Sequence, residues 1–241
     1  MQSMRRFLLA SGAMCAMLVG PIGAAMAGPT FSFSVRSANQ AGVQFDATNT
    51  APGFNGAGSI GATFSYNGPL SFNLGGAQNS TNAGDLNSSF FGANAGSIFN
   101  YTGSGALPGP SGANFATLTN FLASSGSASE YQYGSLYTIG LGVLAAGTRL
   151  TISHDDGVSV FQGGIRIGTT TAGPTAQITE SVVLANAGDT TLYFGRQNGA
   201  PSVLTVAVPE PASIAILGAG LLGLAAVRRR RPAQKGGVTA A

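Results

Sequence analysis

Residues 149–167 read RLTISHDDGVSVFQGGIRI, and this stretch decides the fold class. Apolar side chains occupy every second position in three short runs, at Leu150 and Ile152, Val158 and Val160, and Ile165 and Ile167. An alternation of period two places apolar residues on one face of a β-strand. The breaks between the runs are rich in Asp and Gly, which favour tight turns. The stretch therefore predicts three short strands, the last two forming a hairpin across Gln162-Gly163-Gly164.

Short alternating runs of the same kind recur on both sides of this stretch. They lie at residues 31–35, 60–66, 70–74, 178–184, 191–194 and 203–208. The turn residues Asn67-Gly68-Pro69 predict a hairpin between the second and third of these runs. Short strands separated by glycine-rich turns are typical of sandwiches. The predicted fold class is therefore all-β, an antiparallel β-sandwich of jelly-roll-like type.

Two segments depart from this alternation. Apolar residues from Phe115 to Leu122 recur at helical spacing and predict one short helix over residues 112–123. Residues 75–114 are rich in Gly, Asn, Ser and Ala, and this composition predicts long loops or a weakly ordered insertion. Residues 28–208 together are long enough for one domain with a sizeable core.

Both ends of the chain carry export signals. Residues 1–27 combine two arginines, an apolar run and the cleavage pattern Ala25-Met26-Ala27, which is typical of a secretory signal peptide with an N-terminal signal helix. Cleavage after Ala27 removes Cys15, the one cysteine of the chain. The exported part then has no cysteine, which excludes disulfides and thiolate metal sites.

At the other end, an apolar segment separates a short polar motif from a basic cluster. Pro209, Glu210 and Pro211 precede the uncharged residues 212–227, and Arg228, Arg229, Arg230 and Arg231 follow. A transmembrane helix of this length spans roughly 25 Å, at the low limit for crossing a bilayer. Flanking arginines stay in the cytoplasm and act as stop-transfer residues. Residues 233–241 are therefore predicted to be a cytoplasmic tail, with the bulk of the chain outside.

This three-part order near the C-terminus resembles the PEP-CTERM sorting signal, here residues 209–232. The resemblance implies recognition by exosortase, a membrane transpeptidase-like enzyme that cleaves near the motif. It also implies a Gram-negative bacterium that makes exopolysaccharide. The expected localisation is an inner-membrane intermediate held by the C-terminal helix, followed by the cell surface or the extracellular matrix of a biofilm.

The exported part of the chain is mildly acidic, whereas the whole chain is basic. Residues 28–208 contain four arginines, no lysine and seven acidic residues, so their net charge is −3 (4 − 7). The formal net charge of +3 for the full sequence comes from the two export signals. Since nucleic-acid binding requires a basic surface, nucleic acid is excluded as a partner.

One cluster of residues suggests a ligand site. Asp155 and Asp156 are the only adjacent acidic residues, and His154 before them is the only histidine. Adjacent carboxylates repel each other, and a hard cation such as Ca²⁺, which prefers oxygen ligands, would stabilise the pair. The same residues, followed by Gly157, also suit a plain polar turn. The residues alone leave both interpretations open, and Ca²⁺ is the one cofactor that they suggest.

The surroundings of this pair resemble the protective-antigen-type β-sandwich domain, which also occurs in flocculin-like adhesins. The resemblance covers residues 149–208, with Asp-Asp-Gly, alternating apolar residues and a glycine turn, and residues 191–206 similar to the closing hairpin of that domain. In the adhesins an adjacent aspartate pair holds Ca²⁺, which contacts sugar hydroxyls. The resemblance therefore implies Asp155 and Asp156 as ligands, with Asn198 from the later loop as a third. The chain has no tryptophan to stack on a sugar ring, which weakens the expectation of glycan binding.

No pattern in the chain selects a catalytic site. A Ser-His-Asp hydrolase would need His154, but Asp155 is placed awkwardly to orient it and no G-x-S-x-G motif is present. The first functional hypothesis is therefore an exported, non-enzymatic protein of the surface or exopolysaccharide matrix, with a structural or adhesive role. The second is a Ca²⁺-dependent glycan-binding module that uses Asp155 and Asp156. The third is a secreted hydrolase.

Overall fold

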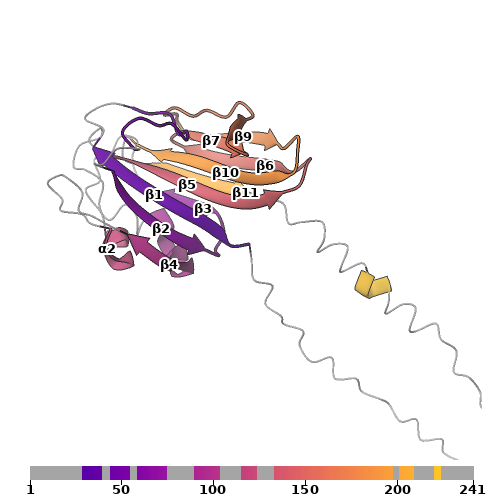
Figure 1. Ribbon diagram of the computed structural model, residues 1–241, viewed down its shortest axis with the longest axis horizontal. Helices are drawn as coiled ribbons and strands as arrows, with labels where there is room; N and C mark the ends of the chain where they lie inside the picture. Colours follow the sequence, from indigo (N-terminus) through magenta and orange to yellow (C-terminus); the bar gives the residue numbers. More distant parts are fainter. Residues whose placement is uncertain are drawn as a thin grey trace, which may run out of the picture.

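The computed structural model of the chain describes residues 29–39, 44–54, 59–74, 90–103, 115–123, 133–197, 201–208 and 220–223. Two β-sheets pack face to face in it (Figure 1). The larger sheet has seven strands in the order β4 (Ile98–Gly103), β2 (Ile60–Tyr66), β1 (Phe31–Asn39), β5 (Tyr133–Leu144), β10 (Gly188–Arg196), β7 (Val158–Gln162) and β8 (Ile165–Ile167). The smaller sheet has four, in the order β3 (Ser71–Leu74), β11 (Ser202–Ala207), β6 (Arg149–Asp155) and β9 (Ile178–Val183). The strands within each sheet pair antiparallel, and the predicted antiparallel sandwich is confirmed.

The apolar residues whose alternation predicted strand β6 are the ones that the structure buries. Leu150 and Ile152 are fully buried between the sheets, while Thr151 and Ser153 on the other face are partly exposed. Each buried aliphatic side chain of this kind contributes roughly 1.5–3 kcal/mol through removal of apolar surface from water. The two sheets are therefore held together by the apolar faces that the sequence pattern defines.

Aromatic side chains fill much of the space between the sheets. The ring of Phe33 in β1 meets the ring of Phe72 in β3 edge-on, with the centroids 6.1 Å apart. Phe90 stacks on Phe72 at 5.2 Å and on Phe194 of β10 at 5.8 Å, so it bridges the two sheets. Offset and edge-on aromatic pairs add stability beyond the area that they bury.

The predicted hairpin between β7 and β8 is confirmed. Gln162 pairs with Ile165, and the two residues between them, Gly163 and Gly164, have φ angles of 56° and 81°. Positive φ at both central positions is the conformation that matches the twist of a two-residue hairpin, and glycine adopts it without strain.

Two other predicted hairpins are wrong, because in each case the two strands lie in different sheets. The turn at 67–69 joins β2 of the larger sheet to β3 of the smaller one, and the Tyr66 hydroxyl donates to the carbonyl oxygen of Pro69 at 2.8 Å. The chain from β10 to β11, expected to be a closing hairpin, likewise crosses between the sheets. Gly, Pro and Asn suit a corner between sheets as well as a hairpin, so turn composition does not identify the partner strand.

The prediction of loops over 75–114 is wrong for residues 90–103. Phe90 and Phe91 are buried in the core, η1 (Gly92–Ser97) is a 3-10 helix, and β4 is an edge strand of the larger sheet. The two phenylalanines anchor this segment although its composition is dominated by small residues. Residues 75–89 and 104–114 lie outside the described part of the chain. Strand β5, in the middle of the larger sheet, was also not predicted.

The single predicted short helix exists, as α2 (Leu118–Ala123), but it begins later than residue 112. The Thr117 hydroxyl accepts a hydrogen bond from the main-chain N–H of Asn120 at 3.1 Å, which is the pattern of a helix N-cap. Phe115 lies before this cap and Phe121 after it, and their rings meet edge-on with centroids 5.2 Å apart. Figure 1 shows α2 beside β4 at one end of the sandwich.

Residues 44–54 cover part of the outer face of the larger sheet. Phe45 and Phe54 pack against each other, with ring centroids 4.5 Å apart, and against Leu136 on the outer side of β5. This second, smaller apolar cluster ties the segment to the sheet. The segment also reaches the end of the sandwich where β6 finishes, through contacts described below.

Most of the export signals lie outside the described residues. This group contains the predicted signal peptide 1–27, the motif Pro209-Glu210-Pro211 and the arginines 228–231. Of the predicted helix 212–227, only the helical turn at 220–223 is described. Across the described ranges, the structure contains no helix with the length and apolar character required to span a bilayer. The predicted domain boundaries, with the tail at 233–241, stay predictions.

Candidate functional site

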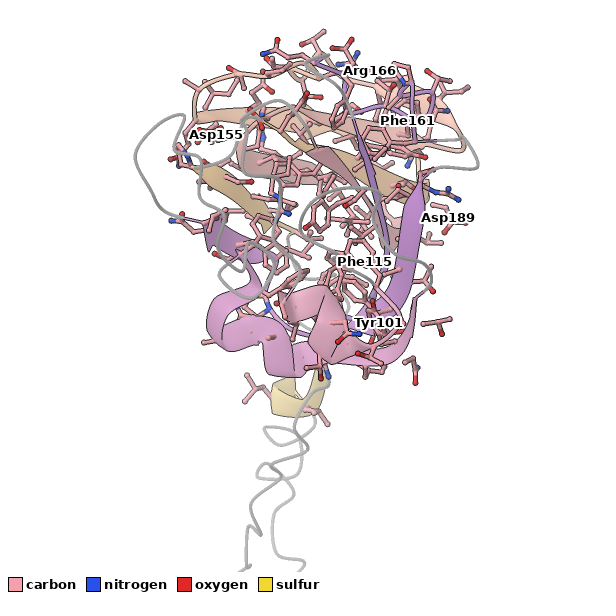
Figure 2. All side chains as sticks on the ribbon, turned by 90° about the vertical axis from the view of Figure 1, so that its left-hand side faces the viewer. Tyr101, Phe115, Asp155, Phe161, Arg166 and Asp189 are labelled. Carbon is pink, nitrogen blue, oxygen red and sulfur yellow. The ribbon has the colours of Figure 1, made fainter. Side chains whose placement is uncertain are left out.

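The aspartate pair lies at one end of the sandwich, where the chain passes from one sheet to the other. Asp155 is the last residue of β6 in the smaller sheet, and Asp156 and Gly157 connect it to β7 in the larger one. Asp155 is 7% exposed and Asp156 only 3%, and the peptide bond between them is cis. In Figure 2, Asp155 lies in the upper half of the sandwich, apart from Tyr101 in the lower half.

Gly157 is needed here because of a close backbone approach. A Cβ atom at this position would overlap the carbonyl oxygen of Ala172. The main-chain N–H of Val158 donates to the carbonyl of Thr171 at 2.8 Å, and the N–H of Gly195 donates to the carbonyl of Gly157 at 2.9 Å. The Asp-Asp-Gly turn is therefore held between the segment around Ala172 and the end of β10.

His154 is a structural link below the turn. It is fully buried, and its Nδ1 lies 2.6 Å from the carbonyl oxygen of Asp156 while its Nε2 lies 2.9 Å from Oε2 of Glu180 in β9. Both partners carry acceptor oxygen atoms, so both ring nitrogens of His154 are engaged in hydrogen bonds. Glu180 in turn accepts hydrogen bonds from the main-chain N–H and the hydroxyl of Thr171, at 2.8 and 3.0 Å.

Glu180 is thereby stabilised as a carboxylate. Burial acts to raise its pKa, but the hydrogen bonds from Thr171 and His154, together with the charge of His154, hold the pKa of Glu180 below its ordinary value. The contact between the His154 ring and the Glu180 carboxylate, with Nε2 and Oε2 2.9 Å apart, connects β9 to the turn.

Gln197, after strand β10, also holds the Asp155–Asp156 turn in place. Its main-chain N–H donates to Oδ2 of Asp156 at 2.6 Å. Its side-chain amide accepts from the N–H of Phe45 at 2.9 Å and donates to the carbonyl of Phe45 at 2.6 Å. One residue thus connects Asp156 with the segment 44–54, and the Asp156 carboxylate has one oxygen held in a defined position.

The two carboxyl groups are costly to ionise together. The pKa of Asp156 is raised to about 8, and burial is the largest cause. The hydrogen bond from the Gln197 N–H and the charge of Arg196 act to lower this pKa, whereas the neighbouring Asp155 acts to raise it. Burial also raises the pKa of Asp155, against the lowering effects of the His154 charge and of the N–H of Gln177. A pair of buried carboxyl groups with raised pKa values is unusual and is a mark of functional sites.

This donor set fits a hard divalent cation. Asp155 and Asp156 supply carboxylate oxygens from adjacent residues, and a cation bound by them would replace the proton that Asp156 otherwise retains. Within the described ranges, no group of three or more His, Cys, Asp or Glu side chains is placed to hold a metal ion. Further ligands to such an ion would therefore come from other oxygen atoms, as Ca²⁺ sites commonly use amide and main-chain carbonyls.

Sequence reasoning identified only part of this site. It found Asp155 and Asp156, which the structure places together at the turn, whereas Asn198 lies outside the described residues, as do Ala25, Ala27, Pro209–Pro211 and Arg228–Arg231. It missed Glu180, Gln197 and Arg196. The sequence could have indicated Glu180, because it is a charged residue at an inward-facing position of the alternating strand β9, between Ile178 and Val182.

Comparison with known proteins identifies the C-terminal signal. The model of the PEP-CTERM protein-sorting motif matches residues 207–231. The chain therefore carries this sorting motif, which indicates an exported, exosortase-sorted cell-surface protein. No curated protein matches the chain.

The sandwich resembles PA14 domains, the protective-antigen type, among solved structures. The PA14 sugar-binding domain from an RTX adhesin is 13% identical, with a TM-score of 0.44 and coverage of 76% of this chain and 90% of that one. The PA14 domain of the MpAFP antifreeze protein is 15% identical, with a TM-score of 0.42 and coverage of 76% and 81%. Both likenesses are distant.

Proposed function

We propose that this chain is a non-catalytic adhesive protein of the cell surface or extracellular matrix, whose sandwich binds a glycan through Ca²⁺ held by Asp155 and Asp156. The observation that carries the proposal is the adjacent pair of buried carboxyl groups at the loop end of the sandwich, 7% and 3% exposed. Burying two such groups side by side without a counter-charge is unfavourable, and a bound divalent cation removes this cost.

The residues around the pair support a binding role. The Gln197 N–H holds one oxygen of Asp156, and His154 holds the main-chain carbonyl of the same residue, so the carboxylates are presented in a fixed arrangement. A bound Ca²⁺ would supply coordination positions for the hydroxyl oxygens of a sugar. Exosortase sorting would deliver this module to the cell surface, where exopolysaccharide is the available class of glycan.

The position of His154 supports a non-catalytic role. It is the one histidine of the chain, it is fully buried, and both of its ring nitrogens are engaged with acceptors. A general base must reach the proton that it abstracts, and a histidine enclosed in this way has no free nitrogen to do so. A hydrolase built on His154 would require the network around it to open.

Thermal melting tests the proposal. The purified protein is melted in EDTA, in millimolar Ca²⁺ and in millimolar Mg²⁺, and compared with an Asp155→Asn/Asp156→Asn variant and with Asp189→Asn as an exposed control. A ligand present at about 100 times its Kd stabilises the native state by about 2.7 kcal/mol. For a domain of this size that corresponds to a rise in Tm of about 5–10 °C.

The outcomes separate calcium-dependent glycan binding from a purely structural role. Stabilisation by Ca²⁺ in the parent protein and in Asp189→Asn, but not in the double variant, is expected. Retention on immobilised polysaccharide in Ca²⁺ and release in EDTA would then establish the glycan as the ligand. A Tm that does not respond to Ca²⁺ would leave a purely structural role for the sandwich and exclude calcium-dependent adhesion.

A further inference from the structure

Arg196 is a buried cation whose guanidinium forms no salt bridge with any described residue. It is the last residue of β10 and is 6% exposed. Its guanidinium carbon lies 5.6 Å from the centroid of the Phe90 ring and 5.7 Å from that of Tyr137. Within the described part of the chain, the one ion pair joins His154 to Glu180, and Nη1 of Arg196 is buried with no hydrogen-bond partner.

Such an arrangement is energetically unusual. Arginine is buried in proteins mainly when its fork of N–H donors meets a carboxylate or a phosphate. The two aromatic rings beside Arg196 offset part of the desolvation cost through cation–π attraction. They provide no acceptor for Nη1, and a buried donor left without an acceptor is costly unless a water, an ion or a ligand supplies one.

Arg196 ends strand β10 at the same end of the sandwich as the aspartate pair. The next residue, Gln197, donates its main-chain N–H to Oδ2 of Asp156 at 2.6 Å. In the facing sheet, Val203 pairs with Asp155, and Ser202 before it is also fully buried with its Oγ unpartnered. Two unsatisfied polar side chains, one from each sheet, therefore lie at the end of the sandwich where Asp155 and Asp156 are presented.

We propose that Arg196 binds the carboxylate of an acidic sugar, so that the glycan recognised at the Asp155–Asp156 site is a uronate-containing one. This inference rests on the proposed function and specifies its ligand class. The charges agree with it: two aspartates contribute −2, Ca²⁺ contributes +2 and Arg196 contributes +1. One carboxylate from the ligand brings the site to neutrality, whereas a neutral sugar leaves the buried arginine charge uncompensated.

The test compares an acidic oligosaccharide with the same oligosaccharide whose carboxylates are masked as neutral methyl esters. Trigalacturonate and its methyl ester are titrated by calorimetry into the full protein in Ca²⁺, and the measurement is repeated with Arg196→Gln and with Arg149→Gln. Arg149 is an exposed residue at the opposite end of β6 from Asp155, so its variant is the matched control. Sodium acetate is titrated separately to detect binding of a free carboxylate.

We expect the parent protein to bind trigalacturonate at least 10-fold more tightly than the ester. Arg149→Gln should keep this preference and Arg196→Gln should lose it. Equal binding of the acid and the ester by the parent protein, a comparison that needs no variant to fold, would overturn the role of Arg196 and leave calcium-dependent glycan binding intact. Binding of neither oligosaccharide, with or without acetate binding, would overturn both the inference and the glycan part of the proposed function.

Discussion

Replacing Asp156 by asparagine is expected to stabilise the metal-free protein at neutral pH. Burial raises the pKa of this carboxyl group from its ordinary value of 3.8 to about 8. The folded protein therefore keeps a proton that the unfolded chain releases. As the pH rises from 3.8 to about 8, the free energy of unfolding falls by about 1.4 kcal/mol per pH unit because of this group. At pH 7 the accumulated loss is about 4 kcal/mol.

Asparagine removes this loss while keeping the shape of the side chain. Its amide oxygen can still accept the hydrogen bond that the Gln197 N–H donates, and it cannot ionise. A gain of about 4 kcal/mol corresponds to a rise in Tm of roughly 10 °C for a domain of this size. Relaxation of the native state and entry of water reduce the measured value, so several degrees is the expected result.

The assay is thermal melting in EDTA between pH 5 and pH 8, with Asp189→Asn as an exposed control. Glu180 acts in the opposite direction, because its lowered pKa stabilises the fold above its ordinary pKa of 4.5 and this stability is lost as the pH falls through the folded value. The chosen window lies above that range. We expect the Tm of the parent protein to fall from pH 5 to pH 8 and that of Asp156→Asn to fall less, because only Asp155, whose pKa is also raised, remains to ionise there.

Two results would refute this reasoning. The first is a parent protein that is as stable at pH 8 as at pH 5 in EDTA. The second is an Asp156→Asn variant that melts at or below the parent Tm at pH 7, which would mean that the ionised carboxylate already has a compensating partner within the protein. Addition of Ca²⁺ should close the gap between the two proteins, because the ion compensates the charge in the parent and finds one ligand fewer in the variant.

Two further predictions concern the turn and the sorting motif. Gly157→Ala should lower the free energy of unfolding by at least about 3 kcal/mol in urea titration, because its Cβ would overlap the Ala172 carbonyl, whereas Gly96→Ala, with open space around it, should change it by less than about 1 kcal/mol. A tolerated alanine at Gly157 would contradict the close approach. Deletion of Pro209–Pro211 should leave an unprocessed, membrane-held chain in cell fractionation, and unchanged processing would argue against exosortase recognition of this motif.

Local features of the chain could be interpreted from the sequence because they depend on near neighbours alone. The alternation at Leu150 and Ile152 marks a strand wherever one face becomes buried, and the Gly163-Gly164 pair marks a hairpin because both residues adopt positive φ. The sorting motif is also a linear signal, and its family model matches it directly.

The pairing and packing of segments far apart in the chain could not be predicted from local sequence. The segments 67–69 and 197–201 have the composition of hairpin turns, yet both connect strands of different sheets. The choice between a hairpin and a corner depends on which apolar faces meet across the core, and that is decided by all strands together. The burial of Phe90 in a segment of loop-like composition has the same cause.

The sequence by itself determined the two-sheet fold class and the C-terminal sorting motif, and it singled out Asp155 and Asp156 as candidate residues, because periodicity, linear motifs and adjacent like charges are properties of neighbouring residues. Only the tertiary structure decided what surrounds that pair. It brings Glu180, Arg196 and Gln197 to the same end of the sandwich from β9, β10 and the segment after β10, respectively. Packing two sheets face to face buries these polar groups together. Because they are buried around it, the Asp155–Asp156 turn becomes a candidate binding site.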